Sequence, residues 1–194
     1  METPELAWQR LLEGNRRFAA GTPLHPRQAP DIRAELAGGQ RPFAAIVGCS
    51  DSRVPAEIIF DCGLGDLFVV RTAGQVLTQA GYATLEFALV NLGVRLIVVL
   101  GHSKCGAVTA ALDGVEAPGY LGELLALLRP VAEQIPEDHD DRLCAAIEEN
   151  VRRGVERLRA LDPVLGRCVA EGQLHIQGAV YELETGLIAP VDAS

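Results

Sequence analysis

The sequence predicts an α/β fold in which helices flank a mainly parallel sheet. Residues 43–48 and 96–100 are nearly all apolar, as expected of strands that are covered on both faces of a parallel sheet. Helical patterns at residues 55–60 and 78–91 lie between these strands. Because strand and helix alternate along the chain, we expect a layered α/β architecture with right-handed crossovers.

Composition narrows the class of protein. The chain has 194 residues, 48% of them hydrophobic, which suits a single domain over residues 1–194. Its net charge is −9 and its 17 Lys and Arg are scattered, which argues against nucleic acid as a partner. Residues 1–5 do not resemble an export signal and no apolar run is long enough for a bilayer, so we expect a cytoplasmic protein without a membrane partner. Five cysteines, an odd number, favour metal binding or reactive thiols over a disulfide framework.

The first 40 residues form a predicted N-terminal helical arm. Residues 4–20 have apolar residues at helical spacing, and Gly21-Thr22-Pro23 ends the pattern. Residues 24–40 are a surface connection with a short helix at 32–36. The apolar side of the first helix needs a partner.

The other elements follow from turn residues and apolar periodicity. Pro55 suits a first helical turn, and Gly93 suits a helix end. The further predicted strands are 66–71 and 174–182, with a last extended piece after the turn at 184–186, and the further predicted helices are 106–112, 120–134, 139–161 and 163–171. The charged surface of residues 148–159 is interpreted as solvent-exposed.

Two short motifs follow the two most apolar strands. Cys49-Ser50-Asp51-Ser52-Arg53 comes after the first strand, and His102-Ser103-Lys104-Cys105 comes after the strand at 96–100. The carboxyl ends of parallel strands lie at one edge of a sheet, so Cys49, His102 and Cys105 are expected to meet there. Two thiolates and one imidazole suit a tetrahedral zinc ion with an open fourth position, the pattern of a catalytic site.

Asp51 and Arg53 are the candidate catalytic residues beside this metal site. Asp51 is two residues from a ligand and could either accept a hydrogen bond from a water on the zinc or bind the zinc as the fourth ligand in a closed state. Arg53 could hold the carboxylate in a bidentate pair. The alternative is that the two form a purely structural ion pair. The remaining cysteines are assigned no role and are expected to be buried apolar residues: Cys62, Cys144 and Cys168.

At these motifs the sequence resembles the β-class carbonic anhydrases. Cys-x-Asp-x-Arg and His-x-x-Cys-Gly are that family's motifs, and the likeness extends to residues 65–71, 86–88 and 178–181, so it covers nearly the whole chain. The resemblance implies a four-stranded, mainly parallel central sheet with flanking helices. It also implies a homodimer or homotetramer in which the N-terminal helix lies across the neighbouring subunit.

The resemblance implies a carbonate dehydratase, a lyase that uses zinc to interconvert carbon dioxide and bicarbonate with release of a proton. Zinc would be held by Cys49, His102 and Cys105, with Asp51 and Arg53 as the catalytic pair. Two alternatives remain at this stage: a carbon disulfide or carbonyl sulfide hydrolase on the same scaffold, and a non-enzymatic zinc-binding protein. The sequence does not identify a proton shuttle among the three other histidines.

Overall fold

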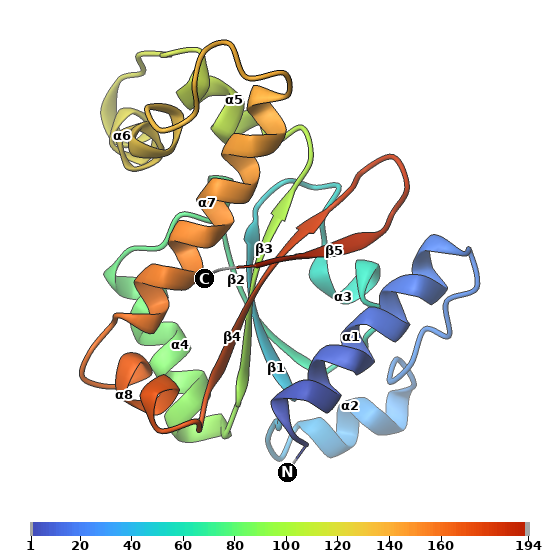
Figure 1. Ribbon diagram of the computed structural model, residues 1–194. Coiled ribbons are helices and arrows are strands. Elements are labelled where there is room, and N and C mark those ends of the chain that lie inside the picture. Colours follow the sequence, from blue (N-terminus) through green and yellow to red (C-terminus); the bar gives the residue numbers. More distant parts are fainter. Residues whose placement is uncertain (1, 193–194) are drawn as a thin grey trace.

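The computed structural model describes residues 2–192 and contains a five-stranded sheet in the order β2-β1-β3-β4-β5 (Figure 1). The strands are β1 (Ala44–Cys49), β2 (Leu67–Thr72), β3 (Leu96–His102), β4 (His175–Tyr181) and β5 (Ile188–Val191). The first four are parallel and β5 runs antiparallel to β4. The prediction of an α/β fold is confirmed. The sheet has five strands rather than the four expected, because the last extended piece pairs with β4 as an edge strand.

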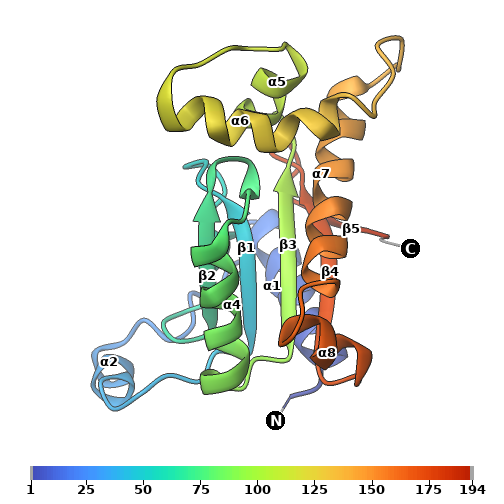
Figure 2. The same ribbon diagram turned by 90° about the vertical axis from the view of Figure 1, so that its left-hand side faces the viewer.

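Helices cover both faces of the sheet and one end of it (Figures 1 and 2). The helices are α1 (Pro4–Ala19), α2 (Pro30–Leu36), α3 (Ala56–Ile59), α4 (Gln79–Leu92), α5 (Gly106–Leu112), α6 (Gly119–Ala132), α7 (Arg142–Arg159) and α8 (Leu165–Ala170), with a short 3₁₀ turn, η1 (Ala73–Gln75), after β2. The predicted helix at 139–161 begins three residues later because the Asp141 side chain accepts a hydrogen bond from the N–H of Cys144 and so caps α7. Within residues 2–192, no helix combines the length and the apolarity needed to cross a membrane.

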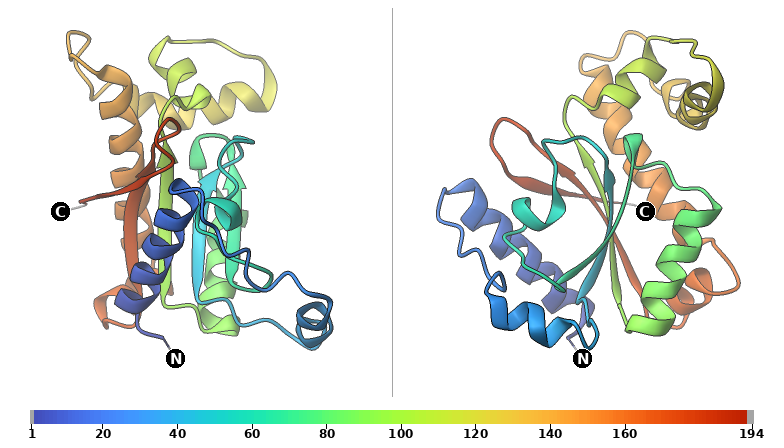
Figure 3. Two further views of the ribbon diagram at one scale, coloured as in Figure 1. Left: turned by 90° about the vertical axis from the view of Figure 1, so that its right-hand side faces the viewer. Right: turned by 180° about the vertical axis from the view of Figure 1, so that it is seen from behind.

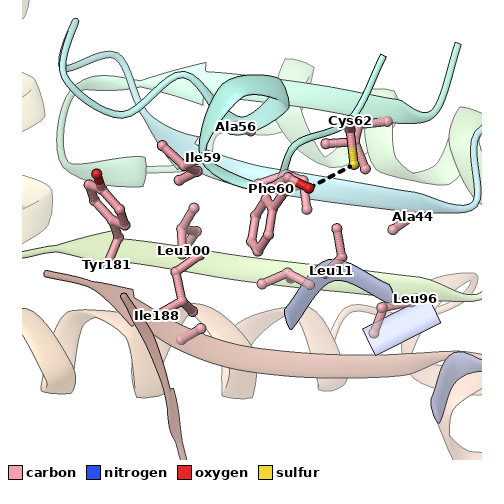
Figure 4. Packing of buried hydrophobic residues seen from close by; sticks show 14 of the residues in the cluster. Leu11, Ala44, Ala56, Ile59, Phe60, Cys62, Leu96, Leu100, Tyr181 and Ile188 are labelled. Carbon is pink, nitrogen blue, oxygen red and sulfur yellow. Dashed lines mark hydrogen bonds between the residues drawn. The ribbon is translucent and has the colours of Figure 1, made fainter. Parts of the chain in front are cut away.

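Two apolar clusters separate the helices into two layers. One face of the sheet packs against α1 and α3 through residues such as Leu11, Leu100 and Ile59 (Figure 4). The other face packs against α4, α7 and α8, and the view from behind shows these helices on the opposite side of the sheet from α1 (Figure 3). The strands β1 and β3 are buried along their whole length, which explains their nearly continuous apolar sequence.

Helix α1 buries its apolar side in its own chain, so the expectation that this side lacks a partner within the subunit is wrong. Ala7 is 2% exposed and Leu11 is fully buried against the sheet. Asn15, 2% exposed, donates hydrogen bonds to the carbonyls of Ile59 (3.1 Å) and Gly186 (2.8 Å) and accepts one from the N–H of Ile188 (2.9 Å). Periodicity identified the helix, but it could not show that one buried amide would tie it to two distant segments.

Helix α7 approaches the sheet closely because glycines face it. A Cβ at Gly101 of β3 would lie 2.7 Å from the Val151 side chain, and one at Gly178 of β4 would lie 2.9 Å from it. On the helix itself, a Cβ at Gly154 would lie 3.0 Å from Val99. The inner side of α7 therefore reaches the carboxyl end of the sheet, which is where the two sequence motifs lie.

Candidate metal centre

The fold brings together the three predicted metal ligands. Cys49 is the last residue of β1, His102 is the last residue of β3, and Cys105 caps α5. The three residues are buried and their ligand atoms all lie within 4.8 Å of one another. Neighbouring parallel strands end at the same edge of the sheet, and this geometry joins residues that are more than 50 positions apart in the sequence.

The side chain of His102 offers one nitrogen to this group. Its Nδ1 lies 2.8 Å from the carbonyl oxygen of Ser103, a contact that assigns the proton to Nδ1 and leaves Nε2 as a free acceptor. Nε2 is buried and has no hydrogen-bond partner among the described residues. Burial alone would lower the pKa of His102, but contacts with Cys49 and the Ser103 carbonyl raise it. A metal ion would supply the partner that Nε2 lacks, so the donor set fits a cation.

The two thiols form a coupled pair. A hydrogen bond from Cys105, followed by smaller contributions from His102 and backbone N–H groups, lowers the pKa of Cys49 against the opposing effect of burial. The same hydrogen bond and burial raise the pKa of Cys105. These opposite shifts favour a thiolate at Cys49 and a proton on Cys105. A metal ion that binds both sulfurs must displace this proton.

Asp51 and Arg53 form the predicted pair beside the three ligands. The guanidinium donates from Nε to Oδ1 (2.9 Å) and from Nη2 to Oδ2 (2.7 Å), and the Arg53 N–H also donates to Oδ1 (2.9 Å). These bonds hold the pKa of Asp51 well below its usual range. Oδ2 of Asp51 lies 3.9 Å from Nε2 of His102, so the carboxylate borders the metal-ligand group while paired with the arginine.

Arg71 is a further residue of the site, outside the two motifs. Its Nε donates to the carbonyl of Cys49 (2.8 Å) and its Nη2 donates to the carbonyl of Asp51 (2.6 Å). It therefore fixes the backbone of the first motif from the adjacent strand β2. The signal was available in principle, since Arg71 stands near the end of a parallel strand next to β1.

The turn between β4 and β5 supports the second motif. The Ser103 hydroxyl donates to Oε1 of Glu182 (2.7 Å) and accepts from the N–H of Leu183 (3.0 Å), and Lys104 pairs with Glu184. Lys104 has a φ of 56°, a left-handed conformation that is uncommon for a residue with a side chain. The loop that carries His102 and Cys105 is thus held in an unusual shape by a turn about 80 residues away.

The other cysteines lie outside this group. Cys62 is buried as expected, and burial raises its pKa to about 12, so it is an unreactive thiol. Cys168 is half-buried. Cys144 is exposed in the first turn of α7, so the prediction that it is buried was wrong. No other group of three His, Cys, Asp or Glu residues with metal-ligand spacing occurs within residues 2–192.

Two buried cysteines and one histidine lie at the carboxyl edge of a parallel sheet, beside a carboxylate–arginine pair. This arrangement is typical of a class of metal-binding α/β proteins. Comparison with known proteins identifies the class more closely. A family model described as carbonic anhydrase matches residues 44–188. Carbonic anhydrase 2 of Mycobacterium tuberculosis strain H37Rv is 46% identical over 187 residues, which cover 94% of this chain and 90% of that protein. The carbonic anhydrase of Mycolicibacterium smegmatis is 42% identical over 189 residues, covering 95% and 92% of the two chains.

Solved structures agree with the sequence relatives. The β-carbonic anhydrase CcaA superposes with a TM-score of 0.78 and 28% identity over 95% of each chain. One of two tetrameric β-carbonic anhydrases from Sordaria macrospora gives a TM-score of 0.77 and 30% identity over 95% of this chain and 96% of that one. The chain belongs to the β-carbonic anhydrase family, a family of enzymes.

Proposed function

We propose that the protein catalyses the zinc-dependent, reversible hydration of carbon dioxide to bicarbonate and a proton. The observation that carries the proposal is the buried Cys49, His102 and Cys105 group, in which Nε2 of His102 has no partner among the described residues. Two sulfur donors and one imidazole nitrogen suit zinc better than calcium or magnesium, which prefer oxygen ligands. Three protein ligands leave a position open for chemistry.

Contacts with the rest of the protein support each ligand. The carbonyl of Ser103 orients His102, Arg71 fixes the backbone at Cys49, and the first turn of α5 follows Cys105 directly. When bound, zinc would acidify a water molecule and so supply a nucleophile at moderate pH. The protein's contribution is a buried, preorganised donor set.

Asp51 would orient the attacking group as a hydrogen-bond acceptor. Because Arg53 lowers the pKa of Asp51, the side chain remains a carboxylate across the physiological range and can only accept. Arg53 in turn determines where the carboxylate points. The side chain of Arg53 is 52% exposed, so the pair contributes little to stability, and positioning explains it better than a structural role does. A closed state in which Asp51 leaves Arg53 and becomes the fourth ligand is part of the proposal.

The test measures metal and activity together. Wild-type protein should contain one zinc ion per chain by elemental analysis, and Cys49→Ala, His102→Ala and Cys105→Ala should each lose it. A variant that retains full zinc would remove that residue from the ligand set. The purified enzyme should hydrate carbon dioxide in a stopped-flow indicator assay. Release of hydrogen sulfide from carbon disulfide or carbonyl sulfide, without carbon dioxide hydration, would instead support the hydrolase alternative.

We also propose a homodimer or homotetramer of single-domain subunits, with residues 1–40 as the N-terminal arm, that functions in the cytoplasm. The relatives from Sordaria macrospora are tetrameric. On this chain the exposed apolar side chains of Ile58 and Leu64 line a hollow of about 540 Å³, which a neighbouring subunit could cover. A fully active monomer in analytical sedimentation would contradict this assembly.

A further inference from the structure

The sulfur of Cys49 has a hydrogen-bond donor that the sequence motifs do not reveal. The chain leaves β2 at Thr72, next to Cys49 in the parallel register, and enters the turn η1. In this turn the N–H of Gly74 points at Sγ of Cys49, with nitrogen and sulfur 3.3 Å apart in a buried environment. A donor at this sulfur withdraws electron density from it, and such contacts tune how strongly a thiolate donates to a metal ion.

The turn that supplies this donor has an unusual conformation. Gly74 has a φ of 62° and Gln75 a φ of 48°, so two consecutive residues are left-handed. A Cβ at Gly74 would lie 3.1 Å from Leu128 and 3.2 Å from Ala107, so both the conformation and the space favour glycine. The side-chain oxygen of buried Gln75 has no hydrogen-bond partner among the described residues. A turn with these costs needs contacts from elsewhere to hold it.

Asn150 of α7 provides such a contact. Its Nδ2 donates to the carbonyl oxygen of Gly74 at 2.9 Å, across 76 residues of sequence. The contact depends on the close approach of α7 to the sheet, because the neighbouring Val151 fills the space that Gly101 and Gly178 leave open. Asn150 thus lies within the helical stretch interpreted from sequence as an exposed charged face, but its side chain reaches the site.

We propose that Asn150 is a positioning residue for the ligand Cys49: by holding the carbonyl of Gly74 it fixes the backbone conformation of that residue, so that the N–H of Gly74 donates to the Cys49 sulfur. The inference rests on the proposed zinc site. It predicts that Asn150, although it touches no ligand, controls both the affinity of the site for metal and the electron density on one of its sulfurs. A residue that served only the packing of α7 would affect stability without changing the sulfur.

The experiment compares wild type with Asn150→Leu, which removes the amide without adding charge, and with Asn150→Asp, which replaces the donor by a carboxylate. Asn91→Asp is the matched control, since it introduces the same charge at an exposed position on α4. Zinc affinity is measured by competition with a chromophoric chelator. Both Asn150 variants are expected to bind zinc about tenfold more weakly than wild type, the effect typical of lost outer-shell contacts, and Asn91→Asp should match wild type.

Cobalt(II) substitution provides a readout that packing alone would not move. In both folded Asn150 variants the sulfur-to-cobalt charge-transfer band should shift to lower energy, because a thiolate without its N–H donor is a stronger electron donor. Wild-type zinc affinity together with an unshifted band in either variant would overturn the proposal. Wild-type protein that binds no zinc would instead overturn the proposed function. If neither variant folds, amide exchange decides: the Gly74 N–H of wild type should be strongly protected, and exchange at the rate of an exposed loop would refute the inference.

Discussion

Replacing Asn15 by alanine is expected to destabilise the protein strongly, because this side chain fastens α1 to the rest of the subunit. The substitution removes three hydrogen bonds to backbone groups and leaves the Ile59 carbonyl and the Ile188 N–H buried without a partner. Each unpaired buried group costs about 1–3 kcal/mol, and the Gly186 carbonyl is only partly buried, so the expected loss is about 3 kcal/mol. This is a large fraction of the roughly 5–15 kcal/mol that stabilises an ordinary domain.

The assay is urea denaturation at fixed protein and free zinc concentrations. With a slope of about 2 kcal/mol per molar urea, a loss of 3 kcal/mol lowers the midpoint by about 1.5 M. Gln9→Ala is the matched control, because Gln9 is an exposed amide on the same helix and its loss should change stability by less than about 0.5 kcal/mol. An Asn15→Ala midpoint within experimental error of the control would refute the intrachain anchoring of α1.

Three further predictions concern charge, backbone and catalysis. Burial raises the pKa of Asp61, but contacts with backbone N–H groups and Arg17 outweigh it, so the pKa is lowered. The contribution of Asp61 to stability is therefore complete above the unfolded pKa of about 3.9 and is lost as pH falls through the lower folded pKa. In urea denaturation Asp61→Asn should cost about 2 kcal/mol at pH 7, and this difference should shrink toward pH 3. Gly74→Ala should lower the melting temperature and weaken zinc binding, because the left-handed φ disfavours a side chain; unchanged values would show that the turn can relax. Activity should rise steeply between pH 6 and 9, with Asp51 paired to Arg53 at alkaline pH and bound to zinc at acidic pH. Asp51 remains a carboxylate throughout this range. Arg53→Ala should have impaired activity, and a flat wild-type profile would contradict the switch.

The sequence was sufficient to predict the four parallel strands and the proposed ligands because both depend on local patterns. An uninterrupted apolar run identifies a strand buried on both faces, and the rule that parallel strands end at one edge brings Cys49 close to His102. The edge strand β5 was harder to assign because its four residues have the mixed burial of an antiparallel edge. Its pairing with β4 depends on the turn rather than on its own composition.

Contacts between distant segments could not be predicted from those patterns. The helical periodicity of α7 marks Val151 as buried, but nothing in it shows that the adjacent Asn150 reaches the Gly74 carbonyl. The position of Asn15 within α1 likewise carries no signal for a bond to Gly186. Such contacts depend on how closely two elements approach, and for α7 glycines on the facing strands determine that distance.

The most direct test of the central claim is reconstitution of the metal-free enzyme. Zinc is removed with a chelator, the initial rate of carbon dioxide hydration is measured by stopped flow, and one equivalent of zinc per chain is returned. We expect activity to disappear with the metal and to return in proportion to the zinc bound, and Cys105→Ala treated in the same way should recover none. Full hydration activity in protein shown by elemental analysis to contain no metal would contradict the proposed mechanism.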